Sequence, residues 1–273
     1  MQLFLIGTPI KHSLSPLIHN YWLKKYNINA SYTAINVKEQ EFLNFTNNFK
    51  NNFFAGNITS PYKEKIIDFL DFFDPLVQEI NVCNCVKIFN NKVYGYNTDI
   101  FGFSAAIKKQ KKIFNNKIAL IIGAGGAARA IIYALYTLGF SKLYIVNRSE
   151  NKIYLLQQLF KHKINIINWN QTINIEADLD LVVNTTSVGL ANNDNNYSKF
   201  FSLEMKQLKK DCLIVDLNYN PSLPLFLQEA KKYNLPILNG LDMLIYQAQE
   251  SFLQWFGIKP LIDNKLKGFL KCY

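Results

Sequence analysis

The sequence contains no run of about eighteen consecutive apolar residues, so no membrane-spanning helix is expected. Its first residues lack the basic segment and the small-residue cleavage site of a signal peptide, and we expect them to form a strand. The four cysteines show no metal-ligand spacing, and the three histidines are too few for a zinc site without further ligands. These absences favour a cytoplasmic protein with reduced thiols and no bound metal.

Apolar residues make up 49% of the 273 positions, which is ample for buried cores, and the length favours two domains. Strand-like and helix-like segments alternate along the chain, a pattern typical of parallel sheets covered by helices. We therefore predict an α/β protein of two domains. A mostly parallel α/β substrate domain is expected over residues 1–100, completed by C-terminal helices within 237–273, and a Rossmann-like, doubly wound nucleotide domain over 101–236.

The net charge of +10 admits nucleic acid as an alternative partner. The lysines are scattered, however, with short runs only within 108–112 and at 209–210. A positive field also suits acidic small molecules and phosphorylated cofactors. We expect a small-molecule substrate and no nucleic acid, and salt-sensitive DNA binding would contradict this expectation.

The most informative segment covers residues 117–148 and reads as strand, glycine turn, helix and strand. Within it, Gly123, Gly125 and Ala128 fit the dinucleotide fingerprint G-x-G-x-x-G/A. The first glycine allows a tight turn, the second lets a pyrophosphate approach the backbone, and the alanine lets the helix pack closely. The helix N-terminus then presents free N–H groups to the phosphates. A glycine-rich turn that binds nothing is the alternative.

The second strand of this segment ends at Asn147, where NAD-binding folds usually carry an acidic residue for the ribose 2′-hydroxyl. Arg148 follows, and its guanidinium can pair with a 2′-phosphate through two parallel hydrogen bonds. Ser149 and Lys152 add a hydroxyl and a second cation, although Glu150 weakens the pattern. The lack of an acid at position 147 favours NADP over NAD.

Three clusters carry side chains suited to chemistry. In the first, Lys63 follows a Gly-Asn-Ile-Thr-Ser-Pro segment and is predicted in the first turn of a helix over 61–73, where the dipole disfavours a cation. The second is Asn97-Thr98-Asp99, whose carboxylate could face Lys63 or whose side chains could simply cap the next helix. In the third, Ser13 and Ser15 follow the first strand, where they could bind a ligand, although Ser15 also suits an N-cap.

Together these segments resemble the shikimate dehydrogenase family, and the matches run the length of the chain. The resemblance rests on motifs at 7–20, 56–63, 84, 95–102, 123–130, 147–149, 184–189, 216–221 and 239–248. This ordered set is more specific than the glycine turn alone. Three departures stand out: Cys85 occupies a position that is commonly threonine, Lys152 replaces a second arginine, and segment 219–224 is one residue short.

The resemblance implies NADPH-dependent, reversible reduction of 3-dehydroshikimate to shikimate, on the route to chorismate and the aromatic amino acids. It implies that Lys63 is the principal acid/base and that Asp99 orients it or shares the proton. It implies a substrate held by Ser13, Ser15, Thr59, Asn84, Asp99, Gln247 and Tyr219. It implies an NADP site formed by Gly123, Gly125, Gly126, Ala127, Ala128, Asn147, Arg148, Ser149, Lys152, Thr185, Val188, Gly240 and Met243.

Three alternatives remain open at this point. A quinate/shikimate enzyme that prefers NAD is disfavoured by the two serines and by Asn147. A non-catalytic, NADPH-binding regulator is disfavoured by the presence of both Lys63 and Asp99. A folate-linked dehydrogenase of similar plan gains no support from the serine cluster. We expect substrate binding between the domains with closure around it, and either a monomer or a homodimer is compatible with the sequence.

Overall fold

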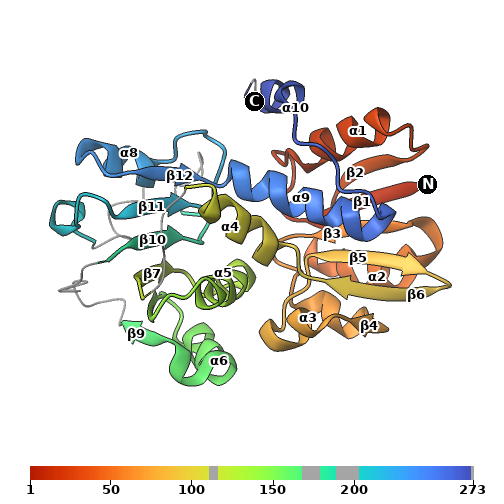
Figure 1. The fold of residues 1–273 in the computed structure, drawn as a ribbon. Coiled ribbons are helices and arrows are strands. Elements are labelled where there is room, and N and C mark those ends of the chain that lie inside the picture. The colour runs from red at the N-terminus through yellow and green to blue at the C-terminus, as the bar shows by residue number, and fades with distance from the viewer. Residues whose placement is uncertain (111–115, 168–178, 189–202, 272–273) are drawn as a thin grey trace. The chain divides into compact units, whose positions relative to one another are not determined.

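A computed structural model describes residues 1–110, 116–167, 179–188 and 203–271 (Figure 1). The chain divides into two compact units, unit 1 with residues 1–102 and 244–273 and unit 2 with residues 103–243. It passes from one to the other within helices α4 (Asp99–Lys108) and α9 (Leu241–Phe256). Strand β12 (Ile237–Asn239) pairs with β11 (Leu213–Asp216). Strand β12 and the residues up to 243 therefore belong to unit 2, whereas the sequence analysis grouped residues 237–273 with the first domain.

Unit 1 is built on a six-stranded sheet of order β2-β1-β3-β5-β6-β4. The pairs β1–β2, β1–β3 and β4–β6 are parallel, and β3–β5 and β5–β6 are antiparallel, so the sheet is mixed. Its strands are β1 (Gln2–Gly7), β2 (Ser31–Asn36), β3 (Ala55–Ile58), β4 (Phe72–Phe73), β5 (Cys85–Phe89) and β6 (Lys92–Tyr96). The carboxyl ends of β1, β3 and β6 and the amino end of β5 therefore share one edge.

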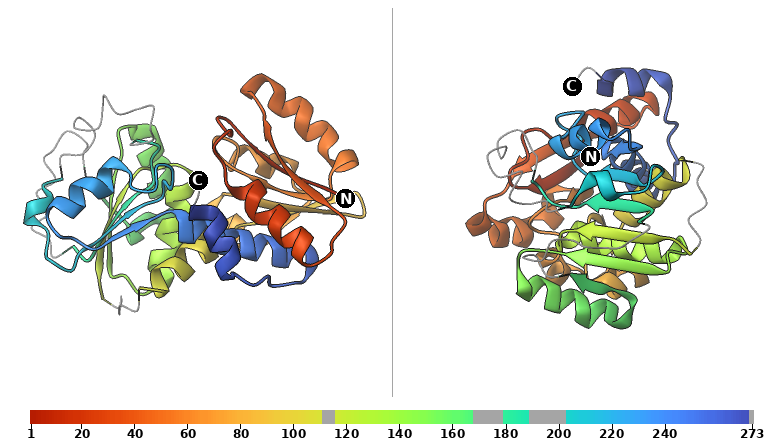
Figure 2. Two further views of the ribbon diagram at one scale, coloured as in Figure 1. Left: turned by 90° about the horizontal axis from the view of Figure 1, so that it is seen from above. Right: turned by 90° about the vertical axis from the view of Figure 1, so that its left-hand side faces the viewer.

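Helices cover both faces of this sheet, as the left view of Figure 2 shows for α1 (Ser15–Lys25) and α2 (Glu39–Asn52). The strand β1 is apolar at successive positions because side chains on both faces are buried. Phe4 lies in the core beside Phe49 of α2, and the other face packs aromatic residues of α1 and α9, such as Trp22 and Phe252. The other α-helices described in this unit are α3 (Pro75–Ile80) and α10 (Asn264–Lys271).

The helix predicted over residues 61–73 is wrong. After β3 the chain makes a turn, followed by a short 3₁₀ helix over Lys65–Phe69 and then β4. The carbonyl of Lys63, which an α-helix would use for its own ladder, instead accepts a hydrogen bond from the Cys83 N–H at 2.9 Å. Tertiary contact thus replaces helical continuation, and the helix-dipole argument for Lys63 has no helix to act through.

Unit 2 carries a second six-stranded sheet, in which all pairs are parallel. Its order is β12-β11-β10-β7-β8-β9, which is the doubly wound order 3-2-1-4-5-6 when strands are counted from β7. Its further elements are β7 (Ile118–Ile122), β8 (Lys142–Val146), β9 (Asn165–Ile167), β10 (Leu181–Asn184), α5 (Gly126–Thr137), α6 (Glu150–Phe160) and α8 (Leu225–Lys232). The two-domain α/β fold predicted from the sequence is confirmed.

Burial in unit 2 explains why its strands are apolar at almost every position. Leu120 and Val182 of the central strands pack with Phe226 and Leu227 of α8, and α5 packs against β7 and β8. Among the described residues, no helix has the length and apolar content needed to cross a membrane.

Candidate functional site

Lys63 and Asp99 meet at the polar edge of unit 1. The Lys63 Nζ lies 2.6 Å from the Asp99 Oδ2, although 36 positions separate the two residues. Lys63 comes from the turn after β3, and Asp99 is the first residue of α4, directly after β6. Their side chains are 16% and 7% exposed, so the pair is mostly shielded from water yet still accessible. Such an ammonium–carboxylate pair can hold and transfer a proton.

Thr98 directly precedes helix α4, and its carbonyl accepts a hydrogen bond from the Gly102 N–H at 2.9 Å, whereas a side-chain hydrogen bond to the first turn comes from Asn97. The Asn97 Oδ1 accepts a hydrogen bond from the Ile100 N–H at 3.3 Å, and its Nδ2 donates to the Val82 carbonyl at 3.0 Å. Asn97 therefore anchors the start of α4 to the segment before β5. This leaves the Asp99 carboxylate for Lys63 and the Thr98 hydroxyl for a different set of partners.

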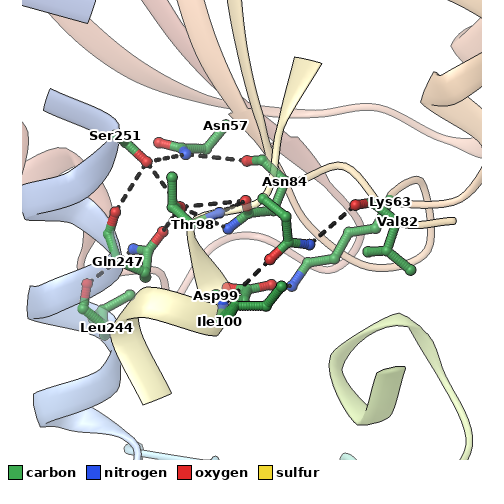
Figure 3. A network of polar contacts seen from close by, with 11 residues as sticks. Asn57, Lys63, Val82, Asn84, Thr98, Asp99, Ile100, Leu244, Gln247 and Ser251 are labelled. Carbon is green, nitrogen blue, oxygen red and sulfur yellow. Dashed lines mark hydrogen bonds and ion pairs between the residues drawn. The ribbon is translucent and has the colours of Figure 1, made fainter. Parts of the chain in front are cut away.

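Those partners form a buried polar network (Figure 3). The Asn84 Oδ1 accepts from the Thr98 N–H at 2.7 Å, and its Nδ2 donates to the Thr98 Oγ1 at 3.0 Å. The Thr98 Oγ1 also lies 3.4 Å from the Gln247 Oε1 and 3.1 Å from the Ser251 Oγ, both on α9. The structure thus brings the predicted residues Asn84 and Gln247 together through Thr98.

Ser13, Ser15 and Thr59 lie at the same edge of the sheet, since they follow the adjacent parallel strands β1 and β3. The Ser13 Oγ accepts from the Ser15 N–H at 3.3 Å, and the Thr59 N–H donates to the Ile6 carbonyl at 2.8 Å. Ser15 is the first residue of α1 and is buried, and Leu14 occupies the N-cap position. The predicted N-cap role of Ser15 is therefore wrong.

In unit 2, the glycine turn has the geometry that its sequence demands. Gly123 has φ +116°, and a Cβ there would collide with the Thr185 side chain. Gly125, at the N-cap of α5, has open space where a side chain would stand. Ala128 is buried, while Gly126 and Ala127 are partly exposed. The turn therefore leaves a free approach to the N-terminus of α5, which suits a pyrophosphate.

The predicted 2′-phosphate residues lie after β8. The Asn147 Nδ2 donates to the Ser149 carbonyl at 3.0 Å, which shapes the loop. Ser149 occupies the N-cap of α6 without making a capping hydrogen bond through its hydroxyl. Arg148, Ser149 and Lys152 are all exposed.

A second buried polar cluster holds the loops after β10 and β11. The Asn184 Nδ2 donates to the Asp216 Oδ2 at 3.1 Å, and the Asn218 N–H donates to the Asp216 Oδ1 at 2.9 Å. Burial raises the pKa of the Asp216 carboxyl to about 7. Asn184 and Asn218 also donate to the Val188 carbonyl, at 3.3 and 3.5 Å, so the cluster supports this predicted cofactor residue.

The other predicted residues of unit 2 lie in these loops or in segments close to them. The Thr185 Oγ1 donates to the Ile122 carbonyl at 2.8 Å, which ties β10 to β7. The Gly240 N–H donates to the Asn218 carbonyl at 3.2 Å, and Met243 is buried. Tyr219 follows Asn218, so this predicted substrate residue belongs to unit 2, whereas the other substrate residues belong to unit 1.

Sequence reasoning gave no site role to several residues that build these sites, although all of them except Ser251 lie in motifs that it singled out. In unit 1 they are Asn57, Thr98 and Ser251, whose side chains are buried and hydrogen-bonded. In unit 2 they are Asn184 and Asp216. All five are polar residues in apolar surroundings, and for Ser251 this is the signal in the sequence that could have found it.

In the described part of the chain, the cysteines are poorly suited to thiolate chemistry. Cys83, Cys85 and Cys212 are buried free thiols, and burial raises the pKa of Cys83 to about 12, so its thiolate is scarce at neutral pH. Cys272 lies outside the described residues. Within the described ranges, no three His, Cys, Asp or Glu side chains form a group that could hold a metal ion.

A doubly wound unit with a dinucleotide turn, joined to an α/β unit with a shielded ammonium–carboxylate pair, defines a two-domain protein of the dehydrogenase class. Three family models match the chain: the shikimate dehydrogenase substrate binding domain over residues 5–86, shikimate/quinate 5-dehydrogenase over 105–221, and the shikimate 5′-dehydrogenase C-terminal domain over 240–264. The chain belongs to the shikimate dehydrogenase family.

Individual relatives agree with this assignment. Shikimate dehydrogenase (NADP(+)) of Bartonella tribocorum is 38% identical over 97% of this chain and 91% of its own. The Pelagibacter ubique protein of the same name is 40% identical over 97% of both chains.

Solved structures share the whole fold. A shikimate dehydrogenase in complex with NADP⁺ superposes with a TM-score of 0.88 at 30% identity, covering 99% of this chain and 94% of its own. The Thermus thermophilus enzyme in complex with NADP(H) and shikimate has a TM-score of 0.83 at 29% identity, covering 99% and 97%. A 5-ketofructose reductase from Gluconobacter has a TM-score of 0.83 at 27% identity, covering 99% and 97%. The fold alone therefore does not set the substrate.

Proposed function

We propose that this chain catalyses the reversible, NADP-dependent interconversion of 3-dehydroshikimate and shikimate. The observation that carries the proposal is the Lys63–Asp99 pair at 2.6 Å, beside the buried side chains of Asn84, Thr98 and Gln247. A polyhydroxylated ring offers both an alcohol for the pair to act on and further hydroxyls for the amide groups to bind. The relatives that carry the name shikimate dehydrogenase (NADP(+)) support this substrate.

Lys63 is proposed as the acid in the reducing direction. Negative charge builds on the carbonyl oxygen as the ketone carbon is reduced, and an ammonium held at that oxygen both stabilises the charge and donates the proton. Asp99 holds the Lys63 Nζ in place through the 2.6 Å contact. In the oxidising direction, the pair accepts the proton of the same hydroxyl.

The substrate is proposed to bind at the shared strand edge of unit 1. Ser13 and Ser15, after β1, would hold the carboxylate through their hydroxyl groups, while Thr59, Asn84 and Gln247 would bind ring hydroxyls. Tyr219 of unit 2 is proposed to contribute near the carboxylate. Residues 1–102 with 244–273 would therefore form the substrate domain.

NADP is proposed to bind unit 2, where its pyrophosphate would meet the open backbone at Gly125 and the N-terminus of α5. Arg148, Ser149 and Lys152 would hold the 2′-phosphate, because they provide two exposed cations and a hydroxyl group. Position 147 carries an asparagine, so no carboxylate there would repel the phosphate. When bound, the reduced nicotinamide supplies the hydride. Thr185, Val188, Gly240 and Met243 would line the nicotinamide end.

This activity would place the chain in the cytoplasm, on the route to chorismate and the aromatic amino acids.

A steady-state absorbance assay tests the proposal with four pairs of reactants: shikimate or quinate, each with NADP⁺ or NAD⁺. We expect the fastest reduction of cofactor with shikimate and NADP⁺. Faster turnover of quinate with NAD⁺ would support the quinate/shikimate alternative. Binding of NADP⁺ without turnover of either acid would overturn the enzymatic proposal and favour a regulator.

A further inference from the structure

We propose that Tyr32, Asn57 and Ser251 are positioning residues that fix the Thr98 hydroxyl and, through it, the orientation of the Asn84 side chain. The inference rests on the proposed function, since it gives the Asn84 amide the task of binding a substrate hydroxyl. None of the three residues is part of the Lys63–Asp99 pair. The carrying observation is a continuous chain of hydrogen bonds from β2 to α9, part of which Figure 3 shows.

The chain begins at Tyr32 of β2, which is 1% exposed. Its hydroxyl donates to the Asn57 Oδ1 at 2.8 Å. This contact sets the orientation of the Asn57 amide, because a carbonyl oxygen accepts a hydrogen bond while the amide nitrogen can only donate. The Asn57 Nδ2 then donates to the Ser251 Oγ at 2.9 Å and to the Asn84 carbonyl at 3.1 Å.

Ser251 passes this orientation to Thr98. Its Oγ accepts from Asn57, and it donates to the Gln247 carbonyl one helical turn earlier at 3.0 Å. The remaining lone pair of the Ser251 Oγ faces the Thr98 Oγ1 at 3.1 Å, so the Thr98 hydroxyl can donate to it. Ser251 is fully buried, and water therefore does not compete for these contacts.

The Asn84 amide at the end of this chain of hydrogen bonds and the Gln247 amide beside it are left with defined binding capacity. The Asn84 Oδ1 accepts a hydrogen bond from the Thr98 N–H, and one N–H of the Asn84 Nδ2 donates to the Thr98 Oγ1. Among the described contacts, the second N–H of the Nδ2 is left to donate to a ligand. The Gln247 Nε2 donates to the Leu244 carbonyl at 2.9 Å, so its Oε1 is the end that lies beside Thr98. Asn84 thus presents a donor and Gln247 an acceptor, a pairing suited to hydroxyl groups.

Removing the Tyr32 hydroxyl should disturb the orientation of these side chains without changing the Lys63–Asp99 pair. In Tyr32→Phe the ring and its stacking on His19 remain, but the Asn57 Oδ1 loses its partner. The Asn57 amide can then rotate, which disturbs Ser251 and the Thr98 hydroxyl. Ser251→Ala breaks the same chain at its centre, by removing the acceptor for the Asn57 Nδ2.

The test measures KM and kcat for shikimate and KM for NADP⁺ in both variants and in wild type. We expect the shikimate KM to rise about three- to tenfold, the size of a lost hydrogen bond, with kcat changed less than about twofold and the NADP⁺ KM unchanged. Thr46→Val is the matched control. Thr46 is a buried helix residue of unit 1 whose hydroxyl donates only within α2, to the Phe42 and Leu43 carbonyls.

An unchanged shikimate KM in both variants would overturn the inference. Equal rises in both KM values, or a fall in kcat at constant KM, would overturn it as well, because positioning of substrate hydroxyls predicts neither. If Tyr32→Phe does not fold, Ser251→Ala decides. If wild type turns over shikimate and the variants show no rise in shikimate KM relative to kcat, the positioning role is wrong and the proposed function stands. If wild type does not turn over shikimate, both the positioning role and the proposed function are wrong.

Discussion

The two units use different means to prepare the same kind of place, the polar edge at the ends of their strands. Unit 1 relies on side chains that meet across long stretches of chain, as Thr98 and Ser251 do across 153 positions. Unit 2 relies mainly on local backbone geometry, a positive φ at Gly123 and open space at Gly125. The difference teaches that a cofactor turn can be recognised from a short motif, whereas a substrate network depends on the complete fold.

The largest expected effect comes from removing the cation of unit 1. Lys63→Ala should lower kcat for shikimate by roughly 10²–10⁴-fold. The variant lacks the proton donor and the positive charge that stabilises the carbonyl oxygen. The shikimate KM should change little. Lys65→Ala is the matched control, since Lys65 is an exposed lysine two positions away that pairs with Glu39. A kcat for Lys63→Ala within about threefold of wild type would show that Lys63 is not the principal acid/base.

Two glycine-to-alanine substitutions, each adding one methyl group, test the role of the glycine turn in unit 2. Gly125→Ala should fold normally, because φ is −86° there and the space is open, yet raise the NADP⁺ KM by at least about tenfold by blocking the pyrophosphate. Gly123→Ala should instead lower the free energy of unfolding by about 1–3 kcal/mol or more, since φ is +116°. Cofactor titration and denaturant unfolding measure the two effects. Similar behaviour of both variants would contradict the distinction.

A smaller effect is expected at the exposed edge of the same unit. Arg148→Gln should raise the NADP⁺ KM about tenfold, because the 2′-phosphate loses its charged, two-pronged partner. The KM for NAD⁺ should stay within about twofold, since NAD⁺ lacks that phosphate. Parallel titration with the two cofactors measures this, and an equal rise for both would place Arg148 away from the 2′-phosphate.

The smallest effects concern pH and stability, where one buried group in each unit acts in the opposite direction. Burial lowers the pKa of His19 to about 3, so its contribution to stability falls as pH drops from 6.5 towards 3, where only the unfolded chain is protonated. Burial raises the pKa of Asp216 to about 7, so its contribution is present below 3.8 and is lost as pH rises towards 7. The two slopes should largely cancel in wild type between about pH 4 and 6.5.

Variants separate the two slopes. His19→Phe should become more stable relative to wild type as pH falls, by up to about 1.4 kcal/mol per pH unit. Asp216→Asn should become less stable relative to wild type as pH falls from 7 towards 4, because it lacks the contribution that Asp216 makes when protonated. Denaturant unfolding between pH 4 and 7 provides the measurement. A pH-independent difference between His19→Phe and wild type would mean that His19 is not buried as a neutral ring.

Much of the fold could be predicted from the sequence, and the failures have physical causes. The strands around Gly123 were found because apolar runs and a glycine turn are local signals. The helix over 61–73 was wrong because the Lys63 carbonyl is taken by Cys83, a partner from another segment. Short strands such as β4 and β9 were not predicted, because two or three residues are too few to show an alternation of apolar and polar side chains.

The candidate site shows the same limit. Lys63 and Asp99 could be selected by residue type and motif, but their meeting depends on the antiparallel pairing that brings β6 beside β5. Ser251 was not selected, because a serine in an otherwise ordinary helix usually has no partner outside it. Only the fold shows that it lies between Asn57 and Thr98.

The central claim is that Lys63 and Asp99 act as one acid/base unit on shikimate. A double-mutant cycle on kcat, with Lys63→Ala, Asp99→Asn and the double variant, tests it most directly. We predict strong non-additivity, with kcat of the double variant within about tenfold of that of the slower single variant. Losses that simply multiply would show that the two groups act independently, and would contradict the account.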